Sequence, residues 1–264
     1  MSRNQGQDPC YTHKVLGSAV QSIGSARFKG KIAAVTGGGR GLGRALARAL
    51  ADEGADVAFS YRESVQESEE AERELLARGG RVYRQRADAR EPGAMAGFVA
   101  DAARSLGGLD LLVNNAGVFR RTPLGEIAEA QLDEAFDVNV KAAVMASQAA
   151  AGPMRARGGG AIVNVASLGG LRAWPSHVAY CASKAALLMA TRCLALALAP
   201  DVRVNAVAPG VLDPPGAPEP MRERIPQRRF GSHDETVRAV LFLLEGASYT
   251  TGEVLSVDGG RSLN

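Results

Sequence analysis

Short apolar runs that end in glycine or asparagine alternate along the chain with longer segments whose apolar residues recur at helical spacing. The runs are typical of buried strands, and the longer segments are typical of helices. We expect strands at 31–36, 55–61, 81–87, 109–113, 161–166, 202–207 and 253–257. We expect helices at 42–53, 63–78, 92–106, 129–155, 177–198 and 236–245, with Pro92 in the first turn of its helix.

Strands separated by helices of this length pair in parallel, because each crossover covers one face of the sheet. The sequence therefore predicts an α/β protein with a single-domain, Rossmann-like, doubly wound sheet of about seven parallel strands and helices on both faces. We assign residues 29–264 to this domain and the polar residues 1–28 to a mobile N-terminal tail. The proline-rich segment around 211–230 is predicted to be an irregular substrate lid.

Composition excludes several other functions. The net charge of +3 and the lack of basic runs interleaved with aromatic residues argue against a nucleic-acid partner. The most apolar stretch, 185–199, is interrupted by Arg192 and is shorter than the ~20 residues of a membrane span, so we expect no membrane association. Residues 1–28 lack the apolar core of a secretory signal, although an organelle address remains an alternative.

The cysteines and histidines point to a reducing compartment without a metal site. Cys10, Cys181 and Cys193 are odd in number and irregularly spaced, which favours free thiols and a cytoplasmic location. The three histidines are scattered, and no spacing among them is typical of metal ligands.

A glycine-rich turn, 36–43, follows the first strand and opens the first helix, which is the context of a dinucleotide-binding turn. Glycines let backbone N–H groups approach a pyrophosphate, and the helix N-terminus favours its charge. Three residues separate the first two glycines of the motif, unlike the usual fingerprint, so a tight turn without a ligand is the alternative. We assign the following residues of this turn to cofactor binding: Gly37, Arg40, Gly41, Leu42 and Gly43.

Charge near the second strand favours NADP(H) over NAD(H). An NAD site usually carries an acidic residue at the end of this strand, but the sequence there is Ser60-Tyr61-Arg62. The guanidinium groups of Arg40 and Arg62 suit a 2′-phosphate, although a solvated Arg62 is the alternative. We also assign Asp88 and Ala89, at the end of the third strand, to the cofactor site. Asp88 can accept a hydrogen bond from adenine or cap the next helix.

Tyr180 and Lys184 stand four positions apart on a predicted helix and therefore share one face. A phenol beside a cation ionises more easily than a free phenol, whose pKa is ~10. Gly37, Asn115, Ser167 and Pro209 all follow predicted strands, where a doubly wound sheet binds its ligand. Together these fragments predict transfer of a hydride and a proton.

With these motifs the chain resembles the short-chain dehydrogenase/reductase family over about residues 29–262. The motifs are Thr36-Gly37-x-x-x-Gly41-x-Gly43, Asn114-Asn115-Ala116-Gly117, Asn139, Ser167, Tyr180-x-x-x-Lys184, Pro209-Gly210 and Asp258-Gly259-Gly260. The resemblance implies a homotetramer or homodimer, and an enzyme acting on a small-molecule carbonyl or secondary alcohol. It implies a catalytic tetrad of Asn139, Ser167, Tyr180 and Lys184. It adds to the cofactor site Asn115, Ala116, Gly117, Tyr180, Lys184, Pro209 and Gly210.

The resemblance also implies roles for the tetrad. Tyr180 would give a proton to the substrate oxygen or take it back. Lys184 would favour the phenolate and hold the nicotinamide ribose, and Ser167 would donate to the substrate oxygen. Asn139 would hold a water that relays protons to Lys184.

Substrate choice is the most open part of the sequence interpretation. The chain looks like 3-oxoacyl-[acyl-carrier-protein] reductases and, more weakly, pteridine reductases. A carrier-linked substrate would suit the lid arginines, Arg222, Arg224, Arg228 and Arg229, although a solvated helix face is the favoured alternative. Sugar or polyol dehydrogenases and polyketide or aromatic ketone reductases stay open, as does a non-enzymatic nucleotide-sensing protein.

Two further observations bear on specificity. We expect the substrate to meet the loop after Gly210 and the segments near Phe119 and Trp174. The family often follows its Pro-Gly pair with a threonine that contacts the cofactor amide, but Val211 and Leu212 follow it here. The nicotinamide contact must then come from the backbone or from another group.

Overall fold

The computed structural model describes residues 26–212 and 219–264. Residues 1–25 of the predicted tail and 213–218 of the predicted lid lie outside the described residues. In the described part, seven parallel strands form one sheet in the order β3-β2-β1-β4-β5-β6-β7. The strands are β1 (Ile32–Val35), β2 (Asp56–Tyr61), β3 (Val82–Arg86), β4 (Leu111–Asn114), β5 (Gly160–Val165), β6 (Val202–Pro209) and β7 (Val254–Val257).

Helices connect these strands, as the sequence predicts. The α-helices are α1 (Gly41–Asp52), α2 (Val65–Leu76), α3 (Ala94–Leu106), α4 (Glu129–Phe136), α5 (Ala142–Ala156), α6 (Val178–Leu198), α7 (Glu219–Glu223) and α8 (His233–Leu241). Two π-helical turns, Asp137–Lys141 and Phe242–Gly246, and two 3-10 turns, Leu168–Gly170 and Arg261–Leu263, complete the described elements.

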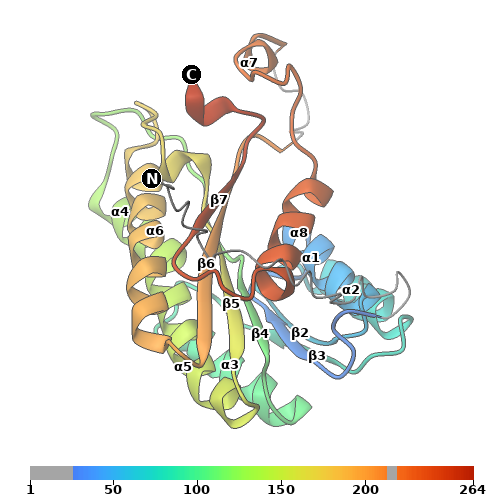
Figure 1. Cartoon of the computed structure of the whole chain (residues 1–264). Coiled ribbons are helices and arrows are strands. Elements are labelled where there is room, and N and C mark those ends of the chain that lie inside the picture. The colour runs from blue at the N-terminus through green and yellow to red at the C-terminus, as the bar shows by residue number, and fades with distance from the viewer. Residues whose placement is uncertain (1–25, 213–218) are drawn as a thin grey trace, which may run out of the picture.

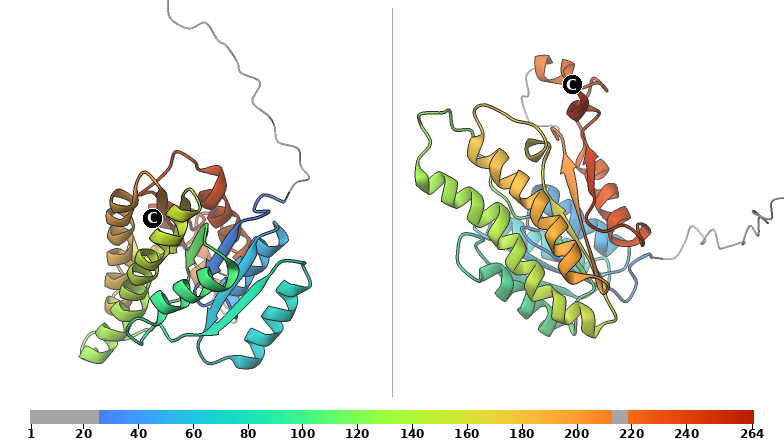
Figure 2. Two further views of the ribbon diagram at one scale, coloured as in Figure 1. Left: turned by 90° about the horizontal axis from the view of Figure 1, so that it is seen from below. Right: turned by 60° about the vertical axis from the view of Figure 1, so that its left-hand side comes forward.

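Alternate residues of each strand point to opposite faces of the sheet. In β1, Ala33 and Val35 belong to the core shared with α1, α2 and α8, whereas Ile32 and Ala34 belong to the core shared with α3, α5 and α6. Figures 1 and 2 show these two helical layers on opposite sides of the sheet. Burying a large apolar side chain in either layer contributes about 1.5–3 kcal/mol. The predicted fold class is therefore confirmed.

Three local expectations differ from the structure. α3 begins at Ala94, after Gly93 in a left-handed conformation (φ 78°), so Pro92 lies in the preceding turn and not in the helix. Two expected helices contain a π-helical turn: the one expected at 129–155 is divided by Asp137–Lys141, and the one expected at 236–245 begins at His233 and ends in Phe242–Gly246. Part of the segment expected to be irregular, Glu219–Glu223, forms α7, which Figure 1 shows beside the C-terminus at one end of the molecule.

Helix α6 is the one described helix long and apolar enough to cross a membrane, with a mean hydropathy of 1.5. Its polar residues Ser183, Lys184 and Thr191 are nevertheless buried within the domain. Thr191 Oγ1 accepts a hydrogen bond of 2.8 Å from Asn164 Nδ2 of β5. These contacts are those of a core helix packed against a sheet.

Arg203 of β6 ties the C-terminal elements to the sheet. Its Nη1 donates to the carbonyl oxygens of Leu243 (2.8 Å) and Ala247 (2.9 Å), and its Nη2 donates to that of Leu244 (2.6 Å). Carbonyl groups at a helix end lack intrahelical donors, so the guanidinium satisfies groups that would otherwise be left unpaired. Burial lowers the pKa of Arg203, because the charged form loses hydration.

We expect Arg203→Met to lower the free energy of unfolding by about 2 to 4 kcal/mol, because the partly buried carbonyls lose charged donors. Urea denaturation followed by circular dichroism measures the change. Arg192→Met, at an exposed position of α6, is the control and should change stability by less than about 0.5 kcal/mol. Equal losses in the two variants would contradict the assigned role.

Candidate active site

The glycine turn is locked to the loop that follows β4. Thr36 Oγ1 accepts hydrogen bonds of 3.0 Å from the backbone N–H groups of Asn115 and Ala116. Asn115 Nδ2 donates back to the carbonyl oxygens of Thr36 (3.0 Å) and Gly37 (3.1 Å). A Cβ at Gly43 would lie 2.1 Å from the Gly37 oxygen, so no side chain fits there. The turn therefore has a fixed shape at the point where β1 separates β2 from β4.

A cleft of about 660 Å³ opens beside this turn. It is lined by the start of α1, the ends of β2 and β3, and the loop after β4. The first N–H groups of a helix have no intrahelical acceptor, and the Arg40 side chain does not cap them in α1. Free donors at the positive end of a helix fit a pyrophosphate, so the residues present suit a dinucleotide.

The structure brings most of the predicted cofactor residues to this cleft. The following predicted residues line it: Gly37, Arg40, Gly41, Leu42, Gly43, Arg62, Asp88, Ala89, Asn115, Ala116 and Gly117. Arg40 is exposed, and its side chain has no ion-pair partner among the residues described. Arg62 forms an ion pair of 3.0 Å with Glu63.

Asp88 does not cap a helix. Its carboxylate accepts hydrogen bonds from the backbone N–H of Arg90 (3.0 Å) and from the Arg90 guanidinium (2.5 Å), which hold the pKa of Asp88 below its usual range. Arg90 and Glu63 also line the cleft, and sequence reasoning missed both. The sequence does carry a signal for both residues. Arg90 lies two positions after Asp88, and Glu63 directly follows Arg62, so each stands beside a predicted cofactor residue of opposite charge.

The predicted catalytic residues lie at the other end of the cleft, in a pocket of about 250 Å³. Ser167 comes from the end of β5, and Tyr180 and Lys184 come from successive turns of α6. Pro209 and Gly210, from the end of β6, form another wall. The pocket shares Leu42, Asn115, Gly117, Val118 and Phe119 with the dinucleotide cleft, so the two spaces adjoin.

Asn139 lies behind the pocket and is almost completely buried. Its Oδ1 accepts a hydrogen bond of 2.9 Å from the Val118 N–H, and its Nδ2 donates to the Val118 carbonyl (3.1 Å) and to Ser183 Oγ (2.9 Å). A Cβ at Gly117 would meet Asn139 Oδ1 at 3.1 Å and Lys184 Nζ at 3.5 Å. Asn139 therefore fixes the loop that faces Lys184, whereas its role in a water relay stays a prediction.

Burial dominates the protonation of the catalytic pair. Lys184 Nζ donates a hydrogen bond of 2.8 Å to the Val165 carbonyl, and burial lowers the pKa of Lys184 to about 8. Burial raises the pKa of Tyr180, while a hydrogen bond with Ser167 acts in the opposite direction. The pKa of the Tyr180 phenol thus shifts in the opposite direction from the expected lowering, because desolvation outweighs the hydrogen bond with Ser167.

Aromatic rings surround Tyr180. The Phe119 ring meets the Tyr180 ring edge-on at 4.8 Å, and Trp174 lies nearly parallel to Tyr180 at 6.1 Å. His177 stacks on Phe119 at 5.0 Å. Both segments expected to meet the substrate thus lie beside the predicted catalytic tyrosine.

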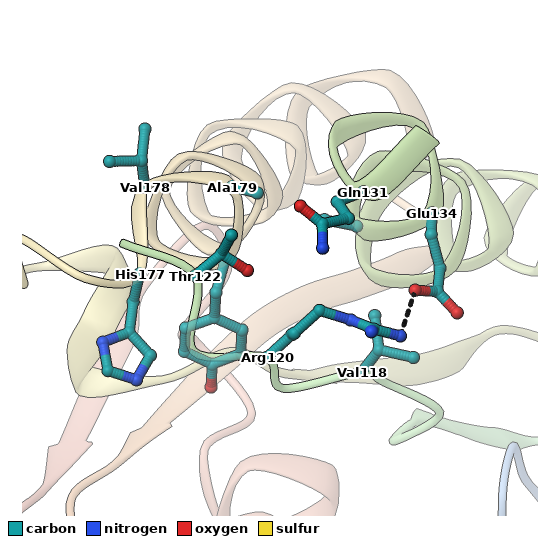
Figure 3. Close-up of a pocket in the computed structure, with 10 residues that line it drawn as sticks. Val118, Arg120, Thr122, Gln131, Glu134, His177, Val178 and Ala179 are labelled. Atoms are coloured by element: carbon teal, nitrogen blue, oxygen red, sulfur yellow. Dashed lines mark hydrogen bonds and ion pairs between the residues drawn. The ribbon is translucent and has the colours of Figure 1, made fainter. Parts of the chain in front are cut away.

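A second pocket adjoins Tyr180 on the side of α4. Figure 3 shows Arg120 and Glu134 pointing toward each other there, and their ion pair measures 3.1 Å. The pocket volume of about 10 Å³ matches roughly one water molecule. It is too small for a substrate.

The whole arrangement agrees with a comparison against protein-family models. Residues 37–262 match the family model described as enoyl-(acyl carrier protein) reductase. The chain belongs to the short-chain dehydrogenase/reductase family. Members of this family are oxidoreductases that bind a nicotinamide dinucleotide, and this chain is an oxidoreductase of that kind.

Curated relatives within the family carry different names. A 3alpha-hydroxysteroid dehydrogenase of Mediterraneibacter gnavus is 36% identical over 88% of this chain and 96% of that protein. An L-xylulose reductase of Caenorhabditis elegans is 43% identical over 58% of this chain and 66% of the relative's length. A 3-oxoacyl-[acyl-carrier-protein] reductase of Thermotoga maritima is 39% identical over 61% of this chain and 70% of that protein.

Solved structures share the whole fold. A short-chain dehydrogenase of Burkholderia cenocepacia J2315, in complex with NADP, superposes with a TM-score of 0.85 and is 37% identical. The match covers 89% of this chain and 99% of that structure.

We expect Tyr180→Phe to lower kcat by at least about 100-fold, because the pocket loses its proton donor. The dissociation constant for the nicotinamide dinucleotide should not change. Stopped-flow absorbance and a fluorescence titration measure the two quantities. Tyr249→Phe is the control, since Tyr249 is fully exposed. Normal turnover by Tyr180→Phe would contradict the catalytic assignment.

The buried Lys184 should make stability depend on pH. Between its folded pKa of about 8 and its usual value of 10.5, the unfolded chain holds a proton that the folded protein has released. Stability from this site therefore rises with pH over that interval and is least below pH 8. The difference in the free energy of unfolding between Lys184→Met and wild type should favour the variant most at pH 7. We expect this difference to be smaller by about 2 to 3 kcal/mol at pH 10.

Urea denaturation at both pH values measures this difference. Lys29→Met, at an exposed position, should show no such pH dependence. A constant difference between wild type and Lys184→Met across this range would mean that Lys184 keeps an ordinary pKa.

Proposed function

We propose that this protein is an NADP(H)-dependent carbonyl reductase or secondary alcohol dehydrogenase. The observation that carries the proposal is the pocket that holds Ser167, Tyr180 and Lys184 and adjoins a cleft built for a dinucleotide. This supports a proton donor and a hydride donor acting on the same carbonyl group.

The bound cofactor supplies the hydride. Ser167 and Tyr180 would donate hydrogen bonds to the carbonyl oxygen, where negative charge develops during reduction. Tyr180 would transfer its proton to that oxygen and accept it in the reverse direction. A phenol is protonated at neutral pH, and burial raises the pKa of Tyr180 further, which suits reduction. Lys184 would hold the cofactor ribose, with Asn139 fixing the loop opposite, and a water relay through Asn139 is part of this proposal.

Preference for NADP(H) rests on the charges at the adenosine end of the cleft. Arg40 and Arg62 line it, and Ser60 and Tyr61 stand where an NAD site would carry an acidic residue. Glu63 and Asp88, two carboxylates that line this end of the cleft, are paired with Arg62 and Arg90. A free 2′-hydroxyl would leave the Arg40 guanidinium without an anion, whereas a 2′-phosphate would bind Arg40 and add a second anion beside Arg62, which already pairs with Glu63.

A 3-oxoacyl thioester is the substrate suggested by the resemblance to 3-oxoacyl-[acyl-carrier-protein] reductases. The described lid arginines add little support for an acidic carrier. Arg229 pairs with Glu235 at 2.6 Å, and Arg228 donates to the Glu223 carbonyl. Arg222 lies over the Phe230 ring at 5.2 Å. The carrier-linked substrate therefore rests on sequence likeness and not on an open cationic surface.

We further propose a homodimer or homotetramer that works in the cytoplasm. The outward face of α6 exposes Met189 (55%) and Leu196 (84%), which a second copy would cover. Cys181 and Cys193, the cysteines in the described part, are free thiols, as expected in a reducing compartment.

A carbonyl panel with NADPH tests the reaction itself. L-xylulose, a 3-oxosteroid and a 3-oxoacyl thioester represent the named relatives, and loss of absorbance at the nicotinamide band reports turnover. Cofactor binding without oxidation by any carbonyl compound would favour the nucleotide-sensing alternative.

We expect Arg40→Ala and Arg62→Ala each to lower kcat/KM for NADPH by about 10- to 100-fold, because each removes a charged donor to the 2′-phosphate. The value for NADH should stay nearly constant. Initial rates with one accepted carbonyl compound measure both. Arg48→Ala is the control because Arg48 lies on α1 and is absent from the cleft lining. A wild-type preference for NADH would refute the cofactor proposal.

A further inference from the structure

The catalytic pocket is bordered by an unusual share of the chain's aromatic residues. Phe, Trp and Tyr make up 5% of the sequence, and there is a single tryptophan. That tryptophan, Trp174, lies in one cluster with Phe119, His177 and Tyr180. Of these rings, Phe119 and the predicted proton donor Tyr180 line the catalytic pocket, so the Phe119 ring lies where a substrate would bind.

Phe119 is the ring of this cluster that is most open to a ligand. It is 64% exposed, whereas Trp174, His177 and Tyr180 are half-buried. His177 stacks on the ring with an interplanar angle of 19°, and Tyr180 meets it at 85°. Phe119 lines both the dinucleotide cleft and the catalytic pocket. Its free surface thus borders the space in front of the Tyr180 hydroxyl group.

The rest of the pocket wall is mostly apolar. Val118, Ala166, Pro209 and Leu212 line it, and Lys184 Nζ already donates to a backbone carbonyl. A polyhydroxylated substrate needs several hydrogen-bonding partners, because each unsatisfied hydroxyl group buried against such a wall is costly. A flat ring, in contrast, gains from stacked or edge-on contact with Phe119.

We infer that the substrate carries an aromatic ring near its carbonyl group, and that Phe119 recognises this ring while Ser167 and Tyr180 hold the carbonyl oxygen. This inference rests on the proposed carbonyl reductase function and narrows its substrate class. Phe119 is thereby a specificity-determining residue, supplied by the loop after β4.

A matched pair of ketones tests the ring preference. 4-Phenylbutan-2-one and 4-cyclohexylbutan-2-one share an unconjugated methyl ketone and differ in ring aromaticity. With saturating NADPH, wild-type kcat/KM should be about 3- to 10-fold higher for the phenyl compound. Phe119→Leu keeps an apolar side chain and should bring this ratio close to one, with the dissociation constant for NADPH unchanged. Leu124→Ala, 83% exposed in the same loop as Phe119, should leave the ratio intact.

Binding without turnover gives an independent readout, since Trp174 is the chain's one tryptophan. Titration of the NADP⁺-loaded protein with the phenyl ketone should quench tryptophan fluorescence at lower concentrations than the cyclohexyl ketone. Phe119→Leu should remove this difference.

The two assays separate the possible failures. Preferential quenching without reduction of either ketone would support the ring site and refute the proposed reaction. Reduction of both ketones at equal efficiency, with equal quenching, would overturn the ring site and leave the reaction standing. Phe119→Leu could also bind NADPH more weakly while its ratio of kcat/KM for the two ketones stays at the wild-type value. That result would overturn the ring site, because it would make Phe119 a cofactor contact.

Discussion

The hydrogen bonds between Thr36 and the Asn115 loop are the constraint on which the site depends. They join the ends of the neighbouring strands β1 and β4. From this pair the chain adds strands outward on one side (β2, β3) and then on the other (β5, β6, β7). A doubly wound sheet leaves a crevice at this position. Because the glycine turn is held against the β4 loop, the dinucleotide cleft and the catalytic pocket keep a common wall. The loop then continues to Val118 and Phe119, where Asn139 holds its backbone.

Burial of the Lys184 side chain in the candidate active site is energetically unfavourable. Lys184 is buried and donates to the Val165 carbonyl, and burial lowers its pKa because the protonated form loses hydration. The two packed helical layers compensate for this cost through apolar burial. This pattern is typical of enzymes, in which the titratable groups at the site are placed for chemistry and the surrounding core supplies stability.

The sequence predicted the order of elements and most of the site because the glycine, asparagine, serine and tyrosine motifs follow strands whose ends meet at one edge. It could not predict the π-helical turn at Asn139, since the apolar spacing of residues 129–155 fits an uninterrupted helix equally well. It also missed the Asp88–Arg90 pair, which depends on side-chain conformation in a turn. The direction of the Tyr180 pKa shift depends on how deeply α6 packs, which residue spacing does not encode.

The close approach at Gly43 has an evolutionary consequence. The same atom positions that leave room for a ligand's phosphates also leave no room for a methyl group, since the Gly37 oxygen and Asn115 Nδ2 would lie 2.1 and 2.5 Å from it. Any larger residue at this position would have to displace the glycine turn after β1 and the Asn115 side chain of the loop after β4. Selection on cofactor affinity and selection on foldability therefore act on one and the same residue, and a descendant that abandoned its cofactor would still be held to glycine there.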